Sequence, residues 1–315
     1  MKNSAVYRRI IECGILPTMF VYGEDENVQL AKTLFDNGIR VVEILQRAPG
    51  AAEAIQTVKQ RIPGMVAGAG TVRSIETAQA AVAAGADFIV TPYYSQEIID
   101  WCNEREIPVI PGCATITEVS LGYRSGLRYF KYFPVKQLGG VEVIRQISEI
   151  YSDVRYVVTG GISYEDLLEF AQNPYVMAVG TTCMMPSSLV KSHDWSKIAD
   201  LTAASVAGIL GMELAYVDRS MDHSLWVLLD LLRRYTRARG RLPEVPETIR
   251  CMARDHTAGL YTNSLERALA FLGAYGMKSE ILLCGDTGIP VVADLQIPMS
   301  GDHVRLIAKH YICGA

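Results

Sequence analysis

The sequence predicts an α/β protein in which a closed (β/α)8 barrel is followed by a smaller α+β domain. Eight short β-rich runs alternate with helical patterns along residues 15–182. A strand recurs roughly every 20 residues and ends in Gly, Pro, Thr or a polar residue, which indicates consecutive βα units. Eight such units favour a closed barrel over an open sheet. We therefore expect the barrel to span residues 1–205 and the second domain to span 206–315.

The expected barrel strands are residues 15–23, 39–47, 65–71, 86–92, 108–114, 128–134, 155–162 and 175–182. Between them lie segments such as 27–38, 74–85 and 95–106, whose apolar residues recur at helical spacing. Glycine often ends these segments, as expected for helix ends.

The composition excludes several classes of protein. The chain has 315 residues and is 50% apolar, which is typical of a globular protein with a large core. With 30 Lys+Arg against 34 Asp+Glu, its net charge of −4 argues against a general affinity for nucleic acid or an anionic membrane. The basic run at 233–241 is a local exception. We interpret it as the solvated end of a helix, with an anion or partner contact as the alternative.

The cysteines and the amino terminus point to a cytoplasmic protein. The seven cysteines are scattered, odd in number and form no CxxC motif, as expected for reduced thiols. Basic residues precede the apolar run at 10–23, but Glu12 and Pro17 interrupt it and no small-x-small cleavage site follows, so we expect no signal peptide. The sequence has no uninterrupted apolar stretch of about 18 residues, so we expect no membrane span.

A lysine stands in the middle of the aromatic run RYFKYFP, residues 128–134. In a strand, Tyr129, Lys131 and Phe133 share one face. An ammonium is costly to bury without a partner. Lys131 therefore has either a carboxylate partner or a role in chemistry.

The second expected strand carries a carboxylate and a guanidinium at period-two spacing. Glu43, Leu45 and Arg47 share one face, so Glu43 and Arg47 are expected to point to the barrel mouth, where the carboxyl ends of the strands build active sites. Each of these residues also has a purely structural interpretation, which stays open. Glu43 would only pair with Lys131 inside the barrel, and Arg47 would only be the exposed end of a strand.

Three glycine-rich segments end strands at the same face. The segment GAGT places Thr71 at the end of the third strand, with glycines that let a ligand approach the backbone. The segments TGG (159–161) and GTT (180–182) end the seventh and eighth strands, where barrels commonly bind phosphate. Ser163 is a predicted N-cap with Asp166 at the third helical position. Each segment alone also fits an ordinary turn, and only their combination predicts an active site.

This set of residues suits imine chemistry. A lysine attacks a ketone only as the free amine, which the desolvating aromatic residues around Lys131 favour. Glu43 is the nearest candidate acid and base for dehydration of the carbinolamine and for proton transfer at carbon. Arg47 is expected to clamp a substrate carboxylate. Lys136 is interpreted as a solvated loop residue rather than a second nucleophile.

The segments VVEILQR, AGAGTV, VTP, IPGCAT, YFKYFP, VVTGGIS and VGTT occur in an order and spacing that resembles the 2-keto-3-deoxy-6-phosphogluconate / 2-keto-4-hydroxyglutarate aldolase family. The resemblance covers about residues 1–200 and implies a class I aldolase on a (β/α)8, or TIM, barrel. The implied reaction is reversible cleavage of a 4-hydroxy-2-keto acid to pyruvate and an aldehyde, either glyceraldehyde 3-phosphate or glyoxylate. It also implies a homotrimer and no metal or organic cofactor.

The resemblance assigns roles to individual positions. Lys131 becomes the Schiff-base lysine, Glu43 the general acid and base, and Arg47 and Thr71 contacts of the pyruvyl carboxylate. The other implied substrate contacts are Pro92, Thr159, Gly160, Gly161, Gly180 and Thr182.

Three positions depart from the family pattern. Thr181 stands where the family often has glycine in the presumed phosphate loop, and its bulk is expected to remove one close backbone contact. The first strand lacks a basic residue near Phe20, and Gln46 is unusual before Arg47. We expect the imine chemistry to be intact and the aldehyde half of the substrate to stay undetermined.

The C-terminal region has a different pattern. Its expected strands are 213–218, 256–263, 281–286, 290–297 and 302–310, and its expected helices are 224–236 and 264–277. The order resembles the paired βαβββ units of glyoxalase-like domains, with a shortened first half. Tyr216 stands where a first-strand histidine is expected, and only His256 begins the matching strand, so the domain is interpreted as a metal-free module for association or ligand sensing. A divergent enzyme is the alternative, and His303 and His310 are expected in an exposed tail.

Two further function classes fit the barrel. The first is a phosphate-binding lyase or isomerase without an imine, in which Lys131 contacts the substrate phosphate as a point charge. The second is a non-catalytic sensor of keto acids. In each case the partner is a small molecule.

Overall fold

The structure is a computed structural model, and it describes residues 2–217, 258–274, 276–285, 288, 290–296 and 303–309. The chain divides into two compact units, Met1–Thr202 and Ala203–Ala315, which are described separately below. Within the described part, no helix is both long enough and apolar enough to cross a membrane.

The first unit is the predicted (β/α)8 barrel. Its strands are β1 (Ile15–Met19), β2 (Val41–Leu45), β3 (Val66–Gly70), β4 (Ile89–Val90), β5 (Val109–Ile110), β6 (Gly112–Cys113), β7 (Tyr129–Tyr132), β8 (Arg155–Thr159) and β9 (Val176–Thr181). They pair in parallel in the order β5-β4-β3-β2-β1-β9-β8-β7-β6. Because β5 and β6 are one run interrupted only at Pro111, the two ends of this sheet meet and the barrel is closed.

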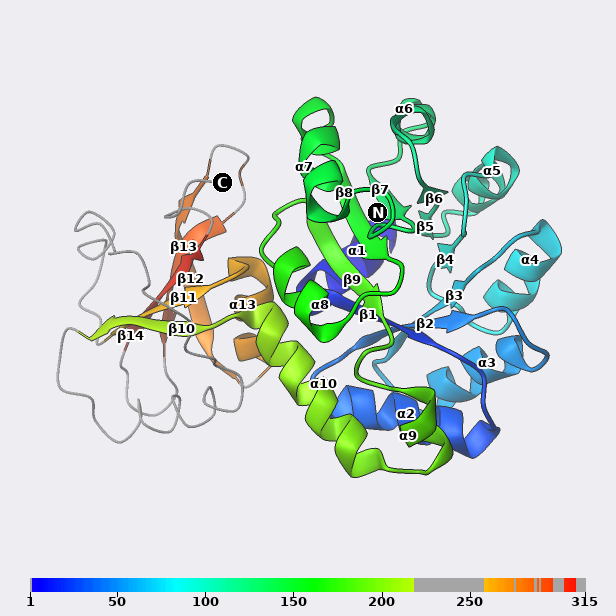
Figure 1. Cartoon of the computed structure of the whole chain (residues 1–315), viewed down its shortest axis with the longest axis horizontal. Helices are drawn as coiled ribbons and strands as arrows, with labels where there is room; N and C mark the ends of the chain where they lie inside the picture. The colour runs from blue at the N-terminus through cyan, green and yellow to red at the C-terminus, as the bar shows by residue number, and fades with distance from the viewer. Residues whose placement is uncertain are drawn as a thin grey trace. The chain divides into compact units, whose positions relative to one another are not determined.

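Helices lie outside the strands (Figure 1). They are α2 (Glu24–Asp36), α3 (Ala51–Arg61), α4 (Ile75–Ala83), α5 (Gln96–Glu104), α6 (Ile116–Arg124), α7 (Gly140–Ile150), α8 (Tyr164–Phe170) and α9 (Ser187–Lys191). The next helix, α10 (Trp195–Leu210), begins in the first unit and ends in the second. Side chains at the loop ends cap several of them. Ser163 and Asp166 form the predicted cap of α8 as a reciprocal capping box.

All eight strands are shorter than the runs predicted for them, and the runs 86–92 and 108–114 differ most. Only Ile89 and Val90 of the run 86–92 are in a strand. The Thr91 hydroxyl donates to the Tyr93 carbonyl at 2.6 Å and accepts the Gly112 N–H at 3.2 Å. The run 108–114 is split at Pro111, which has no N–H to donate to a ladder.

Helix α1 (Lys2–Cys13) closes one end of the barrel. Tyr7 and Ile10 pack in a buried cluster whose other members include Val41, the first residue of β2. The Tyr7 hydroxyl donates to the Val109 carbonyl at 3.0 Å and accepts the Val109 N–H at 2.9 Å, and its ring stacks on Tyr129 with centroids 4.1 Å apart. Burial raises the pKa of this hydroxyl, so it stays protonated. The amino ends of the strands are therefore covered, which leaves the carboxyl ends for a ligand.

The second unit contains the βαβββ order predicted for its second half. Its elements are β10 (Glu213–Val217), β11 (Ala258–Thr262), α13 (Leu265–Gly273), β12 (Lys278–Cys284), β13 (Pro290–Gln296) and β14 (His303–Ala308). The strands form one sheet in the order β10-β11-β14-β13-β12. The helix expected at 224–236, the basic run at 233–241, His256 and His310 lie outside the described residues. The glyoxalase-like assignment stays a prediction.

The expectation that His303 lies in an exposed tail is wrong. His303 is the first residue of β14 and is half-buried, because β14 pairs with both β11 and β13 inside the sheet.

Replacing Tyr7 with Phe is expected to destabilise the barrel. The change leaves the buried N–H and C=O of Val109 without partners, which costs about 1–3 kcal/mol of unfolding free energy. Urea unfolding followed by circular dichroism measures the loss. The matched variant Tyr123→Phe, whose hydroxyl contacts Asp153 at an exposed position, is expected to change stability by less than about 0.5 kcal/mol. An equal loss of unfolding free energy in the two variants would contradict the role of the buried Tyr7 hydroxyl in closing this end of the barrel.

Candidate active site

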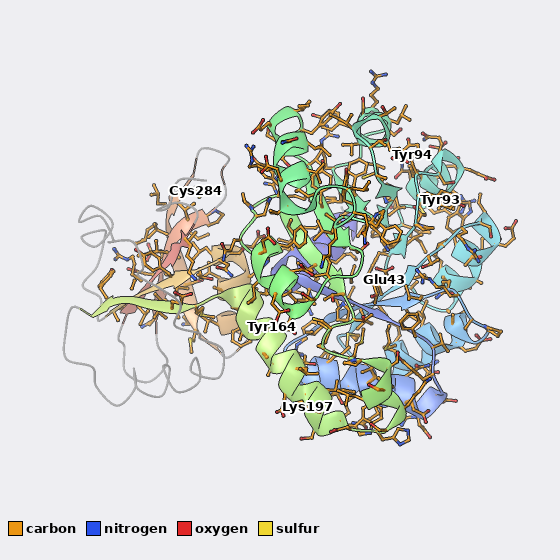
Figure 2. All side chains as sticks on the ribbon, viewed as in Figure 1. Glu43, Tyr93, Tyr94, Tyr164, Lys197 and Cys284 are labelled. Atoms are coloured by element: carbon orange, nitrogen blue, oxygen red, sulfur yellow. The ribbon has the colours of Figure 1, made fainter. Side chains whose placement is uncertain are left out.

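The site centres on an ion pair between Lys131 and Glu43, which the sequence predicted to share the barrel mouth. The Lys131 Nζ lies 3.3 Å from the Glu43 Oε1, and the two side chains are 7% and 0% exposed. Lys131 is the third residue of β7 and Glu43 the third of β2. Three strands, β1, β9 and β8, separate β2 from β7 in the sheet order, so the contact crosses the barrel interior. Figure 2 marks Glu43 in the barrel.

Glu43 is only partly satisfied by this contact. Its second oxygen, Oε2, is buried and has no hydrogen-bond partner among the described residues. A buried carboxylate oxygen without a partner is costly, so its retention points to a group that arrives with the ligand. One oxygen is thus directed at the lysine, while the other is open to a proton, a water or a substrate hydroxyl.

Glycine at position 70 makes room for the Glu43 carboxylate. A Cβ atom at Gly70 would lie 2.0 Å from Glu43 Oε1 and 2.4 Å from its Cγ. The glycine predicted to let a ligand approach the backbone therefore also accommodates the Glu43 carboxylate.

Arg47 and Thr71 are brought together at the mouth. The expectation that Arg47 continues the strand beyond Leu45 is wrong, because the Arg47 N–H turns back to the Leu45 carbonyl at 2.9 Å. The exposed Arg47 side chain instead donates through Nε to the Thr71 Oγ1 at 3.0 Å. Thr71 has a φ of +56°, a conformation that non-glycine residues rarely adopt and that holds its hydroxyl at the end of β3. The terminal guanidinium nitrogens have no acceptor among the described residues and suit a substrate carboxylate.

The aromatic surroundings of Lys131 differ from the expectation. Phe133 lies directly after β7, and its ring centroid is 5.7 Å from Nζ. Phe130 belongs to the opposite face and packs beside Gly122 on α6, where a Cβ atom would be 2.4 Å from the Phe130 ring. Tyr129 stacks on Tyr7. Of the aromatic side chains predicted to desolvate the lysine, Phe133 is therefore its ring contact, and the closed barrel supplies the burial.

Cys113, which sequence reasoning did not single out, lies beside the lysine backbone. Its Sγ contacts the Lys131 carbonyl at 3.5 Å. Burial raises the pKa of this thiol, and the nearby Glu118 raises it further, so the sulfur stays protonated. A protonated thiol does not compete with the lysine as a nucleophile. Its place in the IPGCAT segment was the signal that could have drawn attention to it.

The loop after β4 packs against the strand that joins the barrel ends. A Cβ atom at Gly112 would lie 2.4 Å from the Pro92 carbonyl carbon. Pro92 is therefore fixed close to the backbone of β6, which pairs with β7 through Gly112 and Lys131. The structure places Pro92 one strand away from the lysine.

The loops after β8 and β9 are adjacent, as expected for a binding site at the far end of a ligand. Thr159 is 4% exposed, and its Oγ1 has no hydrogen-bond partner among the described residues. A Cβ atom at Gly180 would be 2.3 Å from the Thr159 Cγ2, so this glycine makes room for the threonine. Gly160 and Gly161 have φ values of +122° and +63°, which the loop after β8 requires.

The Thr181 side chain does not simply fill space in these loops, because it is held by hydrogen bonds. Its buried hydroxyl donates to the Ile162 carbonyl at 2.7 Å and accepts the Cys183 N–H at 3.1 Å. The threonine therefore ties the two loops together and takes one backbone N–H out of ligand binding. Thr182, the next residue, is exposed.

Lys136 lies on the loop after β7 and is engaged in an ion pair. Its Nζ contacts the Asp166 Oδ2 at 2.7 Å, and the same oxygen accepts the Ser163 N–H at 2.7 Å. Partial burial raises the pKa of Asp166, but the hydrogen bonds from Lys136 and Ser163 outweigh it and lower the pKa below its usual value. The interpretation of Lys136 as a simply solvated residue is therefore incomplete.

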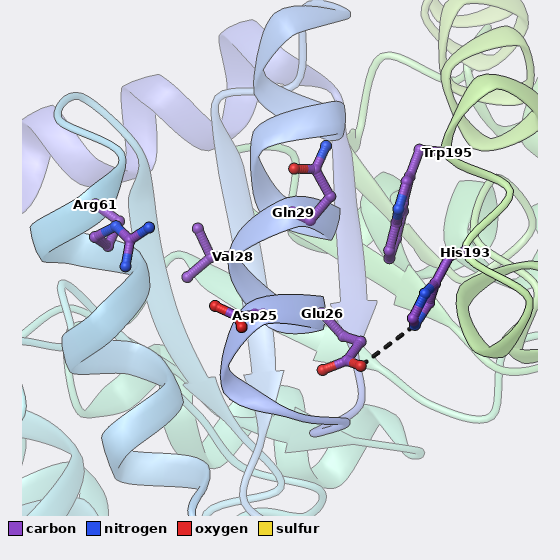
Figure 3. A pocket seen from close by; sticks show the side chains of 7 residues that line it. All are labelled: Asp25, Glu26, Val28, Gln29, Arg61, His193 and Trp195. Carbon is purple, nitrogen blue, oxygen red and sulfur yellow. Dashed lines mark ion pairs between the residues drawn. The ribbon is translucent and has the colours of Figure 1, made fainter.

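A cavity in this unit contains none of the predicted site residues. It measures about 340 Å³ and lies between α2, α3 and the segment 193–195 (Figure 3). Its lining residues are Asp25, Glu26, Val28, Gln29, Arg61, His193 and Trp195. His193 contacts Glu26 at 3.3 Å and stacks on Trp195. Because it is separate from the Lys131 and Glu43 pair, this cavity is not assigned to the chemistry.

Comparison with known families and proteins gives a consistent result for the first unit. The family described as KDPG and KHG aldolase matches residues 6–201. A 2-dehydro-3-deoxy-phosphogluconate aldolase of Treponema pallidum is 34% identical over 197 residues, which cover 62% of this chain and 94% of that protein. The KHG/KDPG aldolase of Escherichia coli K12 is 31% identical over 194 residues, which cover 62% of this chain and 91% of its own.

Solved structures agree. A KDPG aldolase of Legionella pneumophila, with pyruvate captured as a covalent carbinolamine intermediate, has a TM-score of 0.60 and 32% identity, covering 64% of this chain and 96% of its own. The 2-keto-3-deoxy-6-phosphogluconate aldolase of Zymomonas mobilis with 3-phosphoglycerate has a TM-score of 0.59 and 28% identity, covering 64% of this chain and 92% of its own.

Replacing Gly70 with Ala is expected to destabilise the barrel by about 1–3 kcal/mol, because the new methyl group overlaps the buried Glu43 carboxylate. Urea unfolding measures the change. The control is Gly273→Ala at the end of α13, where an added Cβ meets nothing within 4 Å and stability is expected to stay constant or rise. Unchanged stability of the Gly70 variant would show that Glu43 has room to move.

Proposed function

Because the chain belongs to the family of KDPG and KHG aldolases, we propose that Lys131 and Glu43 make its barrel a class I aldolase that reversibly cleaves a 4-hydroxy-2-keto acid to pyruvate and an aldehyde. The observation that carries this assignment is the buried pair of Lys131 Nζ and Glu43 Oε1 at 3.3 Å. A nucleophile beside a group that can hold its proton is the arrangement that covalent catalysis requires. The enzyme is a carbon–carbon lyase.

The first half of the reaction forms the imine. The Lys131 amine, having given its proton to Glu43, attacks the C2 carbonyl carbon of the keto acid. Glu43 then returns a proton to the carbinolamine hydroxyl, which leaves as water. The unpartnered Oε2 gives this carboxylate a second position from which to move a proton without leaving the lysine.

The second half breaks the carbon–carbon bond. Glu43 accepts the proton of the C4 hydroxyl while the electrons of the C3–C4 bond move into the iminium, so that the aldehyde leaves and an enamine of pyruvate remains. Protonation at C3 and hydrolysis of the imine release pyruvate and restore the lysine. No step in this sequence needs a metal ion or an organic cofactor.

Arg47 and Thr71 are proposed to hold the carboxylate of the keto acid. The Nε–Oγ1 contact of 3.0 Å fixes the guanidinium, and its remaining N–H groups form a fork that matches a carboxylate. Fixing this end directs the adjacent carbonyl carbon at Lys131.

The loops after β8 and β9 are proposed to bind the far end of the substrate. This binding site is formed by backbone N–H groups and hydroxyls of Thr159, Gly160, Gly161, Gly180 and Thr182. The names of the relatives include both a phosphorylated and a dicarboxylic substrate, and oxygen-rich anions of either kind suit such donors. Pro92 is proposed to contact the substrate from the neighbouring loop.

The point-charge alternative for Lys131 is less consistent with the burial of the pair. A substrate phosphate placed on Lys131 would also approach the buried Glu43 carboxylate, and two anions at that distance repel. The sensor alternative uses the same contacts and differs only in turnover. The homotrimer and the cytoplasmic location implied by the sequence stay predictions.

Borohydride reduction in the presence of pyruvate is expected to attach a pyruvate-sized group to Lys131, because hydride traps the imine. Intact and peptide mass spectrometry locate it. The Lys131→Ala variant should give no adduct, whereas Lys136→Ala, which removes an exposed lysine five positions later, should give the full adduct. A folded protein without an adduct would exclude the imine mechanism, and an adduct without turnover of any hydroxy-keto acid would favour the sensor.

Replacing Glu43 with Gln is expected to lower kcat about 10²–10⁴-fold, because the amide can neither accept nor return the proton. Steady-state cleavage assays measure the effect on protein whose circular dichroism matches that of the parent. A change confined to KM would assign Glu43 to substrate binding instead.

A further inference from the structure

Strand β1 presents one hydroxyl to the interior of the barrel, and the proposed mechanism does not use it. In the parallel pairing of β1 with β2, Thr18 is the register partner of Glu43. Register partners on neighbouring strands point to the same side of a sheet, so Thr18 lies on the inner face with the Glu43 carboxylate. Leu16, two residues earlier, supports this orientation because it belongs to the buried cluster of Tyr7 and Val41 at the closed end.

The Thr18 side chain is open to the carboxyl end of the barrel. Its chain neighbours Pro17 and Met19 point to the outer face and are buried, whereas Thr18 is half-buried although it lies on the inner face. Because α1 covers the amino end, solvent reaches Thr18 from the mouth. Its hydroxyl makes no hydrogen bond with another described residue, unlike those of Thr91 and Thr181. A ligand at the mouth therefore meets a free hydroxyl.

The strand order places Thr18 between the Glu43 carboxylate and the loops proposed to hold the far end of the substrate. Strand β1 lies between β2 and β9 (Figure 1). On the β9 side, Gly180 is the register partner of Leu16, so Thr18 lies one inward-facing position closer to the mouth than Gly180. The next residues of β9 lead into the far-end loop.

The proposed reaction determines which substrate atom lies at Thr18. Lys131 binds C2, and Glu43 takes the proton of the C4 hydroxyl. The carbon that leads from Glu43 toward the loops after β8 and β9 is C5, and Thr18 stands between those two contacts. A threonine hydroxyl both donates and accepts, which matches a substrate hydroxyl. A carboxylate at C5 would instead bring a second anion beside Glu43, and like charges on neighbouring strands repel.

We propose that Thr18 binds a hydroxyl on C5 of the keto acid and is a specificity-determining residue of the barrel. The inference rests on the proposed aldolase function and names its substrate class. The preferred substrate is a 4,5-dihydroxy-2-keto acid, so the aldehyde half carries a hydroxyl on the carbon next to its aldehyde group. Thr18 moves no proton in this proposal, since Glu43 does so.

Addition of pyruvate to two aldehydes of nearly equal size tests the proposal. Glycolaldehyde carries the hydroxyl, and propanal carries a methyl group in its place. The measurement is kcat/KM for each aldehyde at saturating pyruvate, and its ratio is compared between variants so that the different hydration of the two aldehydes cancels. The parent is expected to favour glycolaldehyde. Thr18→Val should lower this preference by about 3–10-fold, as expected for the loss of one neutral hydrogen bond.

Matched variants assign the effect to the hydroxyl. Thr18→Val keeps the β-branched shape and removes no hydrogen bond within the protein, so it should fold like the parent. If circular dichroism shows otherwise, Thr18→Ala removes the same hydroxyl and takes its place. Thr18→Ser keeps the hydroxyl and should hold the preference within about twofold of the parent. Thr57→Val, at a half-buried threonine of α3 outside the barrel, is the control and should match the parent.

Borohydride trapping separates failure of this proposal from failure of the aldolase function. Thr18→Val should trap pyruvate on Lys131 as fully as the parent, because Thr18 does not contact the C2 carbonyl. A parent that traps no pyruvate overturns the aldolase function itself. A parent that traps pyruvate but adds neither aldehyde overturns the substrate class.

Two further outcomes concern Thr18 alone. An unchanged preference in the folded Thr18→Val variant of an active parent overturns the role of Thr18. Glyoxylate, which places a carboxylate at C5, is the third aldehyde. An equal loss of glyoxylate and glycolaldehyde addition in that variant overturns the assignment of a hydroxyl.

Discussion

The contact between Lys131 and Glu43 is the constraint on which the rest of the barrel depends. A buried ammonium and a buried carboxylate are each unfavourable alone, and their pairing across the interior requires that β2 and β7 be held at a fixed separation. Gly70 leaves space for the carboxylate, and the closed hydrogen-bonded ring sets the distance. The same features that make the pair tolerable for folding also place the lysine amine 3.3 Å from a carboxylate oxygen.

The structure of the closed barrel also determines which of its two ends is available to a ligand. Helix α1 covers the amino ends of the strands, and Tyr7 satisfies both backbone groups of Val109 there. At the opposite end the polar groups are left incompletely paired, as Glu43 Oε2 and Thr159 Oγ1 demonstrate.

The sequence was most informative where residues lie inside regular strands. Period-two alternation placed Glu43 on one face of its strand, and the ion pair with Lys131, which the sequence left open as an alternative, is present in the barrel. The same reasoning failed for Arg47, since it does not determine where a strand ends. The bonding of Thr181 was also beyond prediction, because it depends on a contact between separate segments. The motifs that resemble the aldolase family predicted the chemistry of the barrel. They predicted almost nothing about the function of the second unit.

The interruption at Pro111 divides the barrel into two arms that start from β1. One arm runs through β2 to β5, and the other runs through β9 to β6. The Lys131 N–H donates to the Pro111 carbonyl at 2.9 Å, directly at the seam where the arms join. Glu43 belongs to the first arm and Lys131 to the second. Because its two members lie on different arms, the proposed catalytic pair needs the separation of β2 and β7 that the closed seam helps to set.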